Sequence, residues 1–180
     1  MRNRIAFRVS LGGVISSLCI FFMFCSNLFP MLNYTIPTFA GFLMVIMIVE
    51  TNALWAFITY VSVSLLSFLV TPNIEAALLF TIFMGYYPIL RFYLQKLNNL
   101  PLRIVIKLAV FNAAVISFYL LFQFVFMTED MLEGLERFGK YAPIVLLAGA
   151  NVFFVIYDRL VGQLTGLYVD WFRKKILRRK

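Results

Sequence analysis

Residues 53–70 read ALWAFITYVSVSLLSFLV, an apolar run without a single charged side chain. About 20 apolar residues are the length of an α-helix that crosses the hydrocarbon core of a bilayer. Transmembrane β-strands instead alternate apolar and polar residues, so unbroken apolar runs exclude a β-barrel. We therefore predict a membrane-spanning helix at residues 53–70.

The rest of the chain has the same character. It is 63% hydrophobic and 13% charged, whereas a soluble domain must cover its surface with polar groups. Apolar runs separated by polar or proline-containing breaks predict six segments, at about residues 5–25, 35–49, 53–70, 76–95, 104–126 and 142–168. We expect an all-α fold, a polytopic bundle of six transmembrane helices that forms one integral membrane domain over residues 1–180.

The basic residues predict the orientation of this bundle, because Lys and Arg collect in cytoplasmic connections. With the N-terminus inside, only Arg137 and Lys140 of the 16 Lys and Arg residues lie outside. The same outer connection carries an acidic stretch from Glu129 to Glu136. We predict that both termini are cytoplasmic and that the protein is a multi-pass protein of the cell membrane.

Several functional classes have no support in the sequence. The net charge of +8 comes from basic residues at segment ends, which set topology, so we expect no nucleic-acid partner. Histidine is absent, and Cys19 and Cys25 alone are too few for a zinc site or a disulfide framework. No H-E-x-x-H or G-x-S-x-G motif occurs. We expect no metal, no cofactor and no enzymatic activity.

A stripe of small residues lies in the first segment. Ala6, Ser10, Gly13 and Ser17 recur at spacings of four, three and four residues, which places them along one face of a helix. Small side chains let another helix approach closely in a membrane. Two interpretations remain open: packing against helices of the same chain, or docking of a separate subunit.

Polar groups at membrane depth are costly when unpaired, so they are candidates for a structural or functional role. At the cytoplasmic side, Asp158 is expected to form a network with Lys107, Arg91 or Asn112 that holds the inner half of the bundle together.

A second set of polar and aromatic residues is expected to line an outward-facing cavity that binds a ligand. Tyr86 precedes Pro88 in the middle of the fourth segment, where proline interrupts the helical hydrogen bonds; a simple kink packed on its neighbours is the alternative. The candidate residues are Asn33, Tyr34, Glu75, Tyr86, Tyr119, Gln123 and Asn151.

These features resemble one family, the substrate-binding S components of energy-coupling factor transporters. The similarity rests on the motif RIAFRVSLGGVISS from Arg4 to Ser17, on the long outer loop from Ser26 to Phe39, and on the basic C-terminus. The resemblance implies six helices, both termini inside, and a small-residue stripe that docks on a transmembrane coupling subunit driven by cytoplasmic ATPases. It also implies that a small solute, such as a vitamin, is bound from outside.

The sequence therefore favours a solute-binding membrane subunit whose partners are the lipid bilayer, a coupling subunit and a small molecule. The alternative is a membrane scaffold that transports nothing and belongs to a cell-envelope or cell-shape assembly. Such a scaffold needs the basic ends and the helix faces, but it does not need a cavity.

Overall fold

The structure is a computed structural model that describes residues 2–27, 32–126 and 141–170. All regular secondary structure in these ranges is helical. The contacts within the chain group into two compact units, and each is described by itself. Unit 1 consists of Met1–Lys96 and Val161–Lys180, and unit 2 of Leu97–Leu160. The expectation of a single domain over residues 1–180 stays a prediction.

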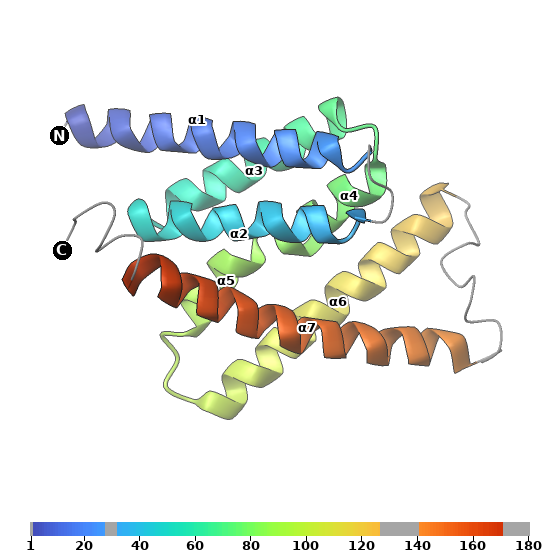
Figure 1. Ribbon diagram of the computed structural model, residues 1–180. Helices are drawn as coiled ribbons and strands as arrows, with labels where there is room; N and C mark the ends of the chain where they lie inside the picture. Colours follow the sequence, from blue (N-terminus) through green and yellow to red (C-terminus); the bar gives the residue numbers. More distant parts are fainter. Residues whose placement is uncertain (1, 28–31, 127–140, 171–180) are drawn as a thin grey trace. The chain divides into compact units, whose positions relative to one another are not determined.

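Three helices form the first part of unit 1: α1 (Arg2–Cys25), α2 (Thr35–Glu50) and α3 (Ala53–Val70). α2 and α3 are joined by a two-residue connection, in which the side chain of Asn52 caps α3 by accepting a hydrogen bond from the Trp55 N–H at 3.0 Å. The segments expected at residues 35–49 and 53–70 are thus two helices joined by a tight connection. Figure 1 shows α1 running alongside α2. Both α2 and α3 pack against α1.

The face of α1 that packs on α2 and α3 carries Ile15, Cys19 and Met23, which are fully or almost fully buried. Gly12 lies on the same side, where an added Cβ atom would come within 3.3 Å of the Thr59 hydroxyl and 3.4 Å of the Met47 methyl group. The absence of a side chain at Gly12 therefore lets α1 approach its neighbours closely.

A broken helix completes the core of unit 1. It consists of α4 (Ile74–Leu79), the π-helical turn η2 (Phe80–Met84) and α5 (Tyr87–Leu94). Pro88 has no N–H to donate, and it stands in the first turn of α5, where none is required. The expected kink is therefore present, but the backbone is irregular upstream of the proline, at residues 80–86.

Side chains stabilise the irregular turn. The Tyr60 hydroxyl donates to the backbone carbonyl of Thr81 at 2.7 Å, which gives a partner to a carbonyl of the π-helical turn. Gly85 accommodates the surrounding rings, since a Cβ atom there would lie 2.6 Å from the ring of Tyr60 and 2.8 Å from that of Phe80. The turn is thus built around a glycine and packed aromatic side chains.

Unit 2 contains α6 (Leu100–Phe126) and the first part of α7 (Ala142–Leu167); the remainder of α7 belongs to unit 1. Figure 1 shows these two helices crossing. At the crossing, the rings of Phe111 and Phe154 stack with centroids 4.5 Å apart, and both side chains are buried. The two helices begin and end close to the boundaries expected from the sequence.

Within the described residues, five helical stretches are long and apolar enough to cross a membrane: Ile5–Cys25, Ala53–Val70, Ile74–Leu94, Leu100–Leu121 and Ala142–Asp170. α2 is apolar but has only 16 residues, about 24 Å of helix against a hydrocarbon core of about 30 Å. The protein is therefore a helical, multi-pass membrane protein. A count of six spans stays a prediction.

Candidate functional site

The small-residue stripe of α1 lies on the open side of the helix. Ala6, Ser10, Gly13 and Ser17 are all exposed, and no atom beyond the helix's own backbone lies within 4 Å of a Cβ atom added at Gly13. The Ser17 hydroxyl donates to the Gly13 carbonyl at 2.9 Å. Because α1 buries a different face, the stripe leaves a smooth surface unoccupied by the described part of the chain.

Three of the expected ligand-binding residues gather at the end of unit 1 where α2 and α4 begin. Tyr34 directly precedes α2, and Glu75 stands in the first turn of α4. Partial burial raises the pKa of the Tyr34 hydroxyl, and the charge of Glu75 raises it further. Asn33 has a buried side-chain oxygen, Oδ1, for which the described structure provides no hydrogen-bond partner. This end of the unit is thus polar, and one of its buried hydrogen-bond acceptors has no partner among the described residues.

The other candidate ligand residues are not gathered there. Tyr86 stands at the start of α5 and packs edge-on against the rings of Tyr60 and Phe83, at centroid distances of 5.9 and 6.1 Å. Tyr119 lies half-buried on α6 in unit 2. Gln123 is also on α6, but its side chain lies outside the described residues.

Polar pairs join the two helices of unit 2. Lys107 Nζ lies 2.7 and 2.8 Å from the two carboxylate oxygens of Asp158, and the side chains are 10% and 24% exposed. Asn112 and Asn151 exchange two side-chain hydrogen bonds, of 3.1 and 2.9 Å. Each amide also donates to a carbonyl of its own helix.

These contacts bring together three of the four residues expected in the polar network, although in two pairs. Asn112 bonds to Asn151, a residue that the sequence analysis assigned to ligand binding. The fourth member, Arg91, belongs to unit 1 and lies on α5. Asn151 already bonds to Asn112 and to its own helix, which makes it a weak candidate for a ligand.

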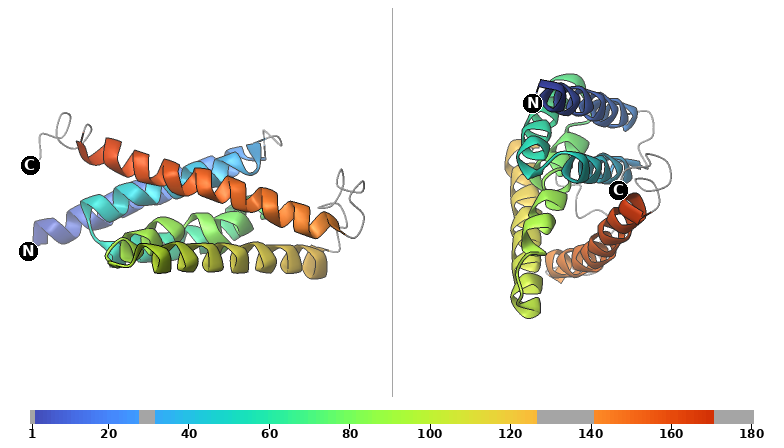
Figure 2. Two further views of the ribbon diagram at one scale, coloured as in Figure 1. Left: turned by 90° about the horizontal axis from the view of Figure 1, so that it is seen from below. Right: turned by 90° about the vertical axis from the view of Figure 1, so that its left-hand side faces the viewer.

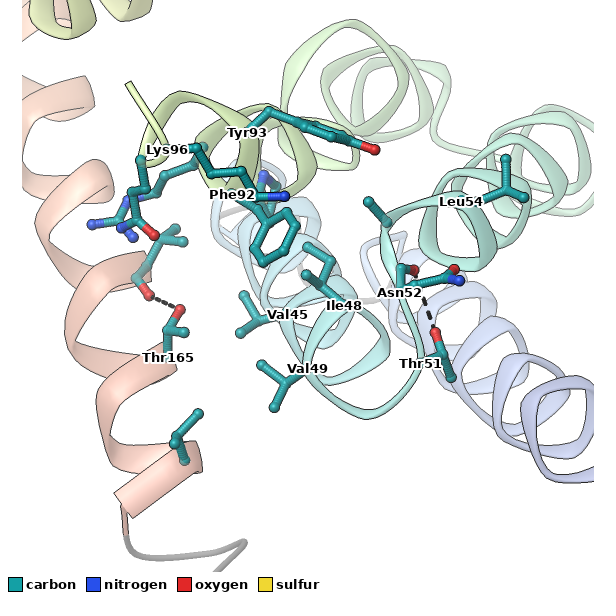
Figure 3. A pocket seen from close by; sticks show the side chains of 16 residues that line it. Val45, Ile48, Val49, Thr51, Asn52, Leu54, Phe92, Tyr93, Lys96 and Thr165 are labelled. Carbon is teal, nitrogen blue, oxygen red and sulfur yellow. Dashed lines mark hydrogen bonds between the residues drawn. The ribbon is translucent and has the colours of Figure 1, made fainter. Parts of the chain in front are cut away.

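A cavity of about 670 Å³ lies in unit 1, at the end where α2 and α5 finish and α3 begins. Figure 3 shows Phe92 of α5 and Lys96, which follows that helix, above the aliphatic side chains of α2, with Thr165 of α7 across from them. None of the seven expected ligand-binding residues lines it. The lining residues are Val45, Ile48, Val49, Thr51, Asn52, Ala53, Leu54, Pro88, Arg91, Phe92, Tyr93, Gln95, Lys96, Val161, Thr165 and Val169.

Two basic side chains of this cavity are held in place by their neighbours. Lys96 Nζ lies 4.6 Å from the ring centroid of Phe92 and 5.4 Å from that of Tyr93, which is cation–π geometry. The Arg91 guanidinium packs over Gly162, where an added Cβ atom would lie only 2.5 Å from Nη2. Glycine at position 162 therefore provides the space that the guanidinium occupies.

The cavity could not be predicted from the sequence. The signal available was modest: basic and aromatic residues cluster at the end of the fourth segment, from Arg91 to Lys96. No spacing in the sequence indicates that Gly162 packs against Arg91, because the two residues are brought together only by the packing of α5 and the last turns of α7.

Comparison with known proteins adds no assignment. No family model matches the chain, and neither a curated protein nor a solved structure gives a significant match. The fold defines the protein as a multi-pass helical membrane protein, and a more specific function has to be argued from its own residues.

Proposed function

We propose that this chain is the solute-binding membrane subunit of a transporter, of the kind to which the resemblance to S components points. In this proposal it crosses the cell membrane six times with both termini in the cytoplasm. It binds a small solute from outside, and α1 docks on a separate transmembrane subunit that is coupled to ATPases.

One observation carries the proposal: the small-residue stripe of α1 is open. The sequence left packing within the chain and docking of another subunit as alternatives. Within the described residues, no atom of another helix lies within 4 Å of a Cβ atom added at Gly13, and Ala6, Ser10 and Ser17 are exposed. An exposed small-residue face in a membrane favours the close approach of a further helix, because association there depends on tight packing. This supports docking.

The polar end of unit 1 supports a ligand on the outer side. A buried amide oxygen without a partner costs about 1–3 kcal/mol, and the described residues provide no partner for Asn33 Oδ1, beside Tyr34. A solute that donates a hydrogen bond would remove this cost. Under the proposed topology, the beginnings of α2 and α4 face outward, as uptake requires.

The substitution Gly13→Leu tests the docking face. No atom of the described residues obstructs a side chain at Gly13, so the variant is expected to keep the thermal stability of the parent protein in detergent. Leu on a close-contact face would weaken docking by about 1–3 kcal/mol. Co-purification with a coupling subunit, identified by mass spectrometry, should therefore fall strongly.

Gly149→Leu is the matched control, because Gly149 also lies in a helix and, in the described part of the chain, nothing lies within 4 Å of an added Cβ atom. It should leave co-purification unchanged. A loss of stability in Gly13→Leu, or equal partner recovery from both variants, would contradict docking through α1.

The proposed topology has its own test, since the charge asymmetry that suggests it makes a sharp prediction. Single cysteines placed at Glu133 and Arg178, in a background without Cys19 and Cys25, should react differently with a membrane-impermeant thiol reagent. Position 133 should be labelled on intact cells, and position 178 only after permeabilisation. Labelling of position 178 from outside would overturn the topology.

A specific observation favours the scaffold as a second candidate function. The residues expected to line one ligand site are divided between the two units, and Asn151 is bonded to Asn112. A scaffold would need only the docking face. Solute uptake that depends on Asn33 and Glu75 would favour the transporter, whereas partner docking without any uptake would favour the scaffold.

A further inference from the structure

The cavity of unit 1 joins an apolar wall to a basic rim. Val45, Ile48 and Val49 of α2 contribute aliphatic side chains to its wall, and Val161 and Val169 contribute others. Arg91 and Lys96 are its charged residues, and no Asp or Glu is among the lining residues. A site of this composition suits an amphiphile with an apolar part and an anionic group.

Two side chains that line the cavity, Lys96 and Asn52, carry hydrogen-bond donors that suit an anion. The Lys96 ammonium contacts ring faces and makes no ion pair with the described residues, so its N–H donors are available to an anion. Asn52 uses its side-chain oxygen to cap α3, and no described residue accepts a hydrogen bond from its amide nitrogen. Glu50, beside the cavity, accepts a hydrogen bond from the Tyr168 hydroxyl at 3.3 Å.

The position of the cavity relates these groups to the membrane. It lies where α2 and α5 end and α3 begins, so it is at the border between the apolar helix surface and the polar connections. Leu54 at its edge is 63% exposed. Basic pockets between transmembrane helices on the cytoplasmic side bind the head groups of anionic lipids. The charge distribution of the sequence assigns this end to the cytoplasmic side.

We propose that the cavity binds one anionic phospholipid from the adjacent leaflet. The phosphate lies against Lys96 and Arg91. An acyl chain runs along the aliphatic side chains of the cavity wall and leaves the cavity over Leu54. A volume of about 670 Å³ falls within the usual range of ligand sites, about 300–1,000 Å³. The proposal rests on the membrane location of the chain and on the cytoplasmic side that the charge distribution assigns to this end, and it does not require solute transport.

Native mass spectrometry of the purified full chain tests the proposal, with phosphatidylglycerol and phosphatidylcholine of identical acyl chains as probes. The protein should retain one phosphatidylglycerol in preference to phosphatidylcholine. Lys96→Gln should weaken phosphatidylglycerol binding about fivefold, the effect expected for one basic residue at an anionic membrane surface. Arg103→Gln, which removes the same charge from α6 outside the cavity, should change binding less than twofold.

A second pair of variants tests the apolar part of the site. Thr165→Phe introduces a ring at a lining position and should displace the lipid. Gly166→Phe introduces the same ring at the next residue, where no described atom lies within 4 Å of an added Cβ atom, and should leave binding intact. Lys96 is exposed, so the charge variant provides a test even if Thr165→Phe does not fold.

Three results would overturn the proposal. Equal losses in Lys96→Gln and Arg103→Gln would mean that binding follows general surface charge. Equal retention of the two lipids would mean that the head group is not recognised. Stabilisation by inorganic phosphate as strong as that by phosphatidylglycerol, in a thermal-shift assay, would mean that the site holds a free anion and not a lipid.

Discussion

The two units join their helices by different means. In unit 1, α1, α2 and α3 meet through residues such as Gly12, Ala40 and Ala56, and their approach depends on shape. In unit 2, α6 and α7 are linked by Lys107 with Asp158 and by an asparagine pair.

The difference follows from the membrane as a solvent. Lipid tails are as apolar as Leu, so helices in a bilayer gain little from burying apolar surface and associate through close packing or hydrogen bonds. Unit 1 has several helices around α2, which can interlock on more than one side (Figure 2). The described part of unit 2 has one helix pair, and direct polar contacts hold its members in register.

The largest expected effect is in unit 2. Asp158→Ala should lower stability by about 3–5 kcal/mol, because it leaves the buried Lys107 ammonium without its counter-ion. Thermal unfolding in detergent measures this loss. The double variant Lys107→Met with Asp158→Leu removes both charges and should recover most of the stability. A single variant as stable as the parent would show that the ion pair does not hold the two helices together.

In unit 1 the sharpest test is steric. Gly85→Ala should cost about 1–3 kcal/mol, because the added methyl group overlaps the rings of Tyr60 and Phe80. Gly149→Ala provides the control: its methyl group meets no atom of the described residues, and alanine favours a helix, so stability should stay the same or rise slightly. If both variants unfold at the same temperature, packing around the π-helical turn is looser than the contacts indicate.

The smallest effect concerns the asparagine pair. A double-mutant cycle with Asn112→Ala and Asn151→Ala should give a coupling free energy of about 0.6 kcal/mol, and no more than about 1.7 kcal/mol, the range measured for such bonds in membranes. Chemical or thermal unfolding in detergent would supply the four free energies. Additive losses would mean that the two amides act separately.

The positions of the helices could be predicted from the sequence, because apolar run length and polar breaks depend on local composition alone. Residues 35–49 and 53–70 correspond closely to α2 and α3. The segment at 76–95 is also helical, but its π-helical turn was not foreseen, since proline indicated only that a kink was near. At Phe80–Met84 the backbone hydrogen bonds span five residues instead of four, and this change cannot be recognised from the amino-acid composition.

Some features of the candidate sites could likewise be predicted from the sequence, and others could not. That Asp158 has a polar partner follows from the cost of burying an isolated charge, which the sequence makes apparent. The structure selects Lys107 from the three expected partners. The partner of Asn112 could not be chosen in advance, because an amide can bond to any polar group at its depth. The seven expected ligand residues were grouped by depth alone, and depth does not specify which helix faces meet.

The sequence by itself determined that the chain is a helical membrane protein, since hydrophobicity and length are properties of each segment taken separately. Only the tertiary structure decided which face of α1 is buried, where the cavity lies and which side chains line it. Those features depend on how helices rotate and pack against one another. Gly12 and Gly13 make the point: they are neighbours of the same type in the sequence, yet one packs against Thr59 and the other lies open.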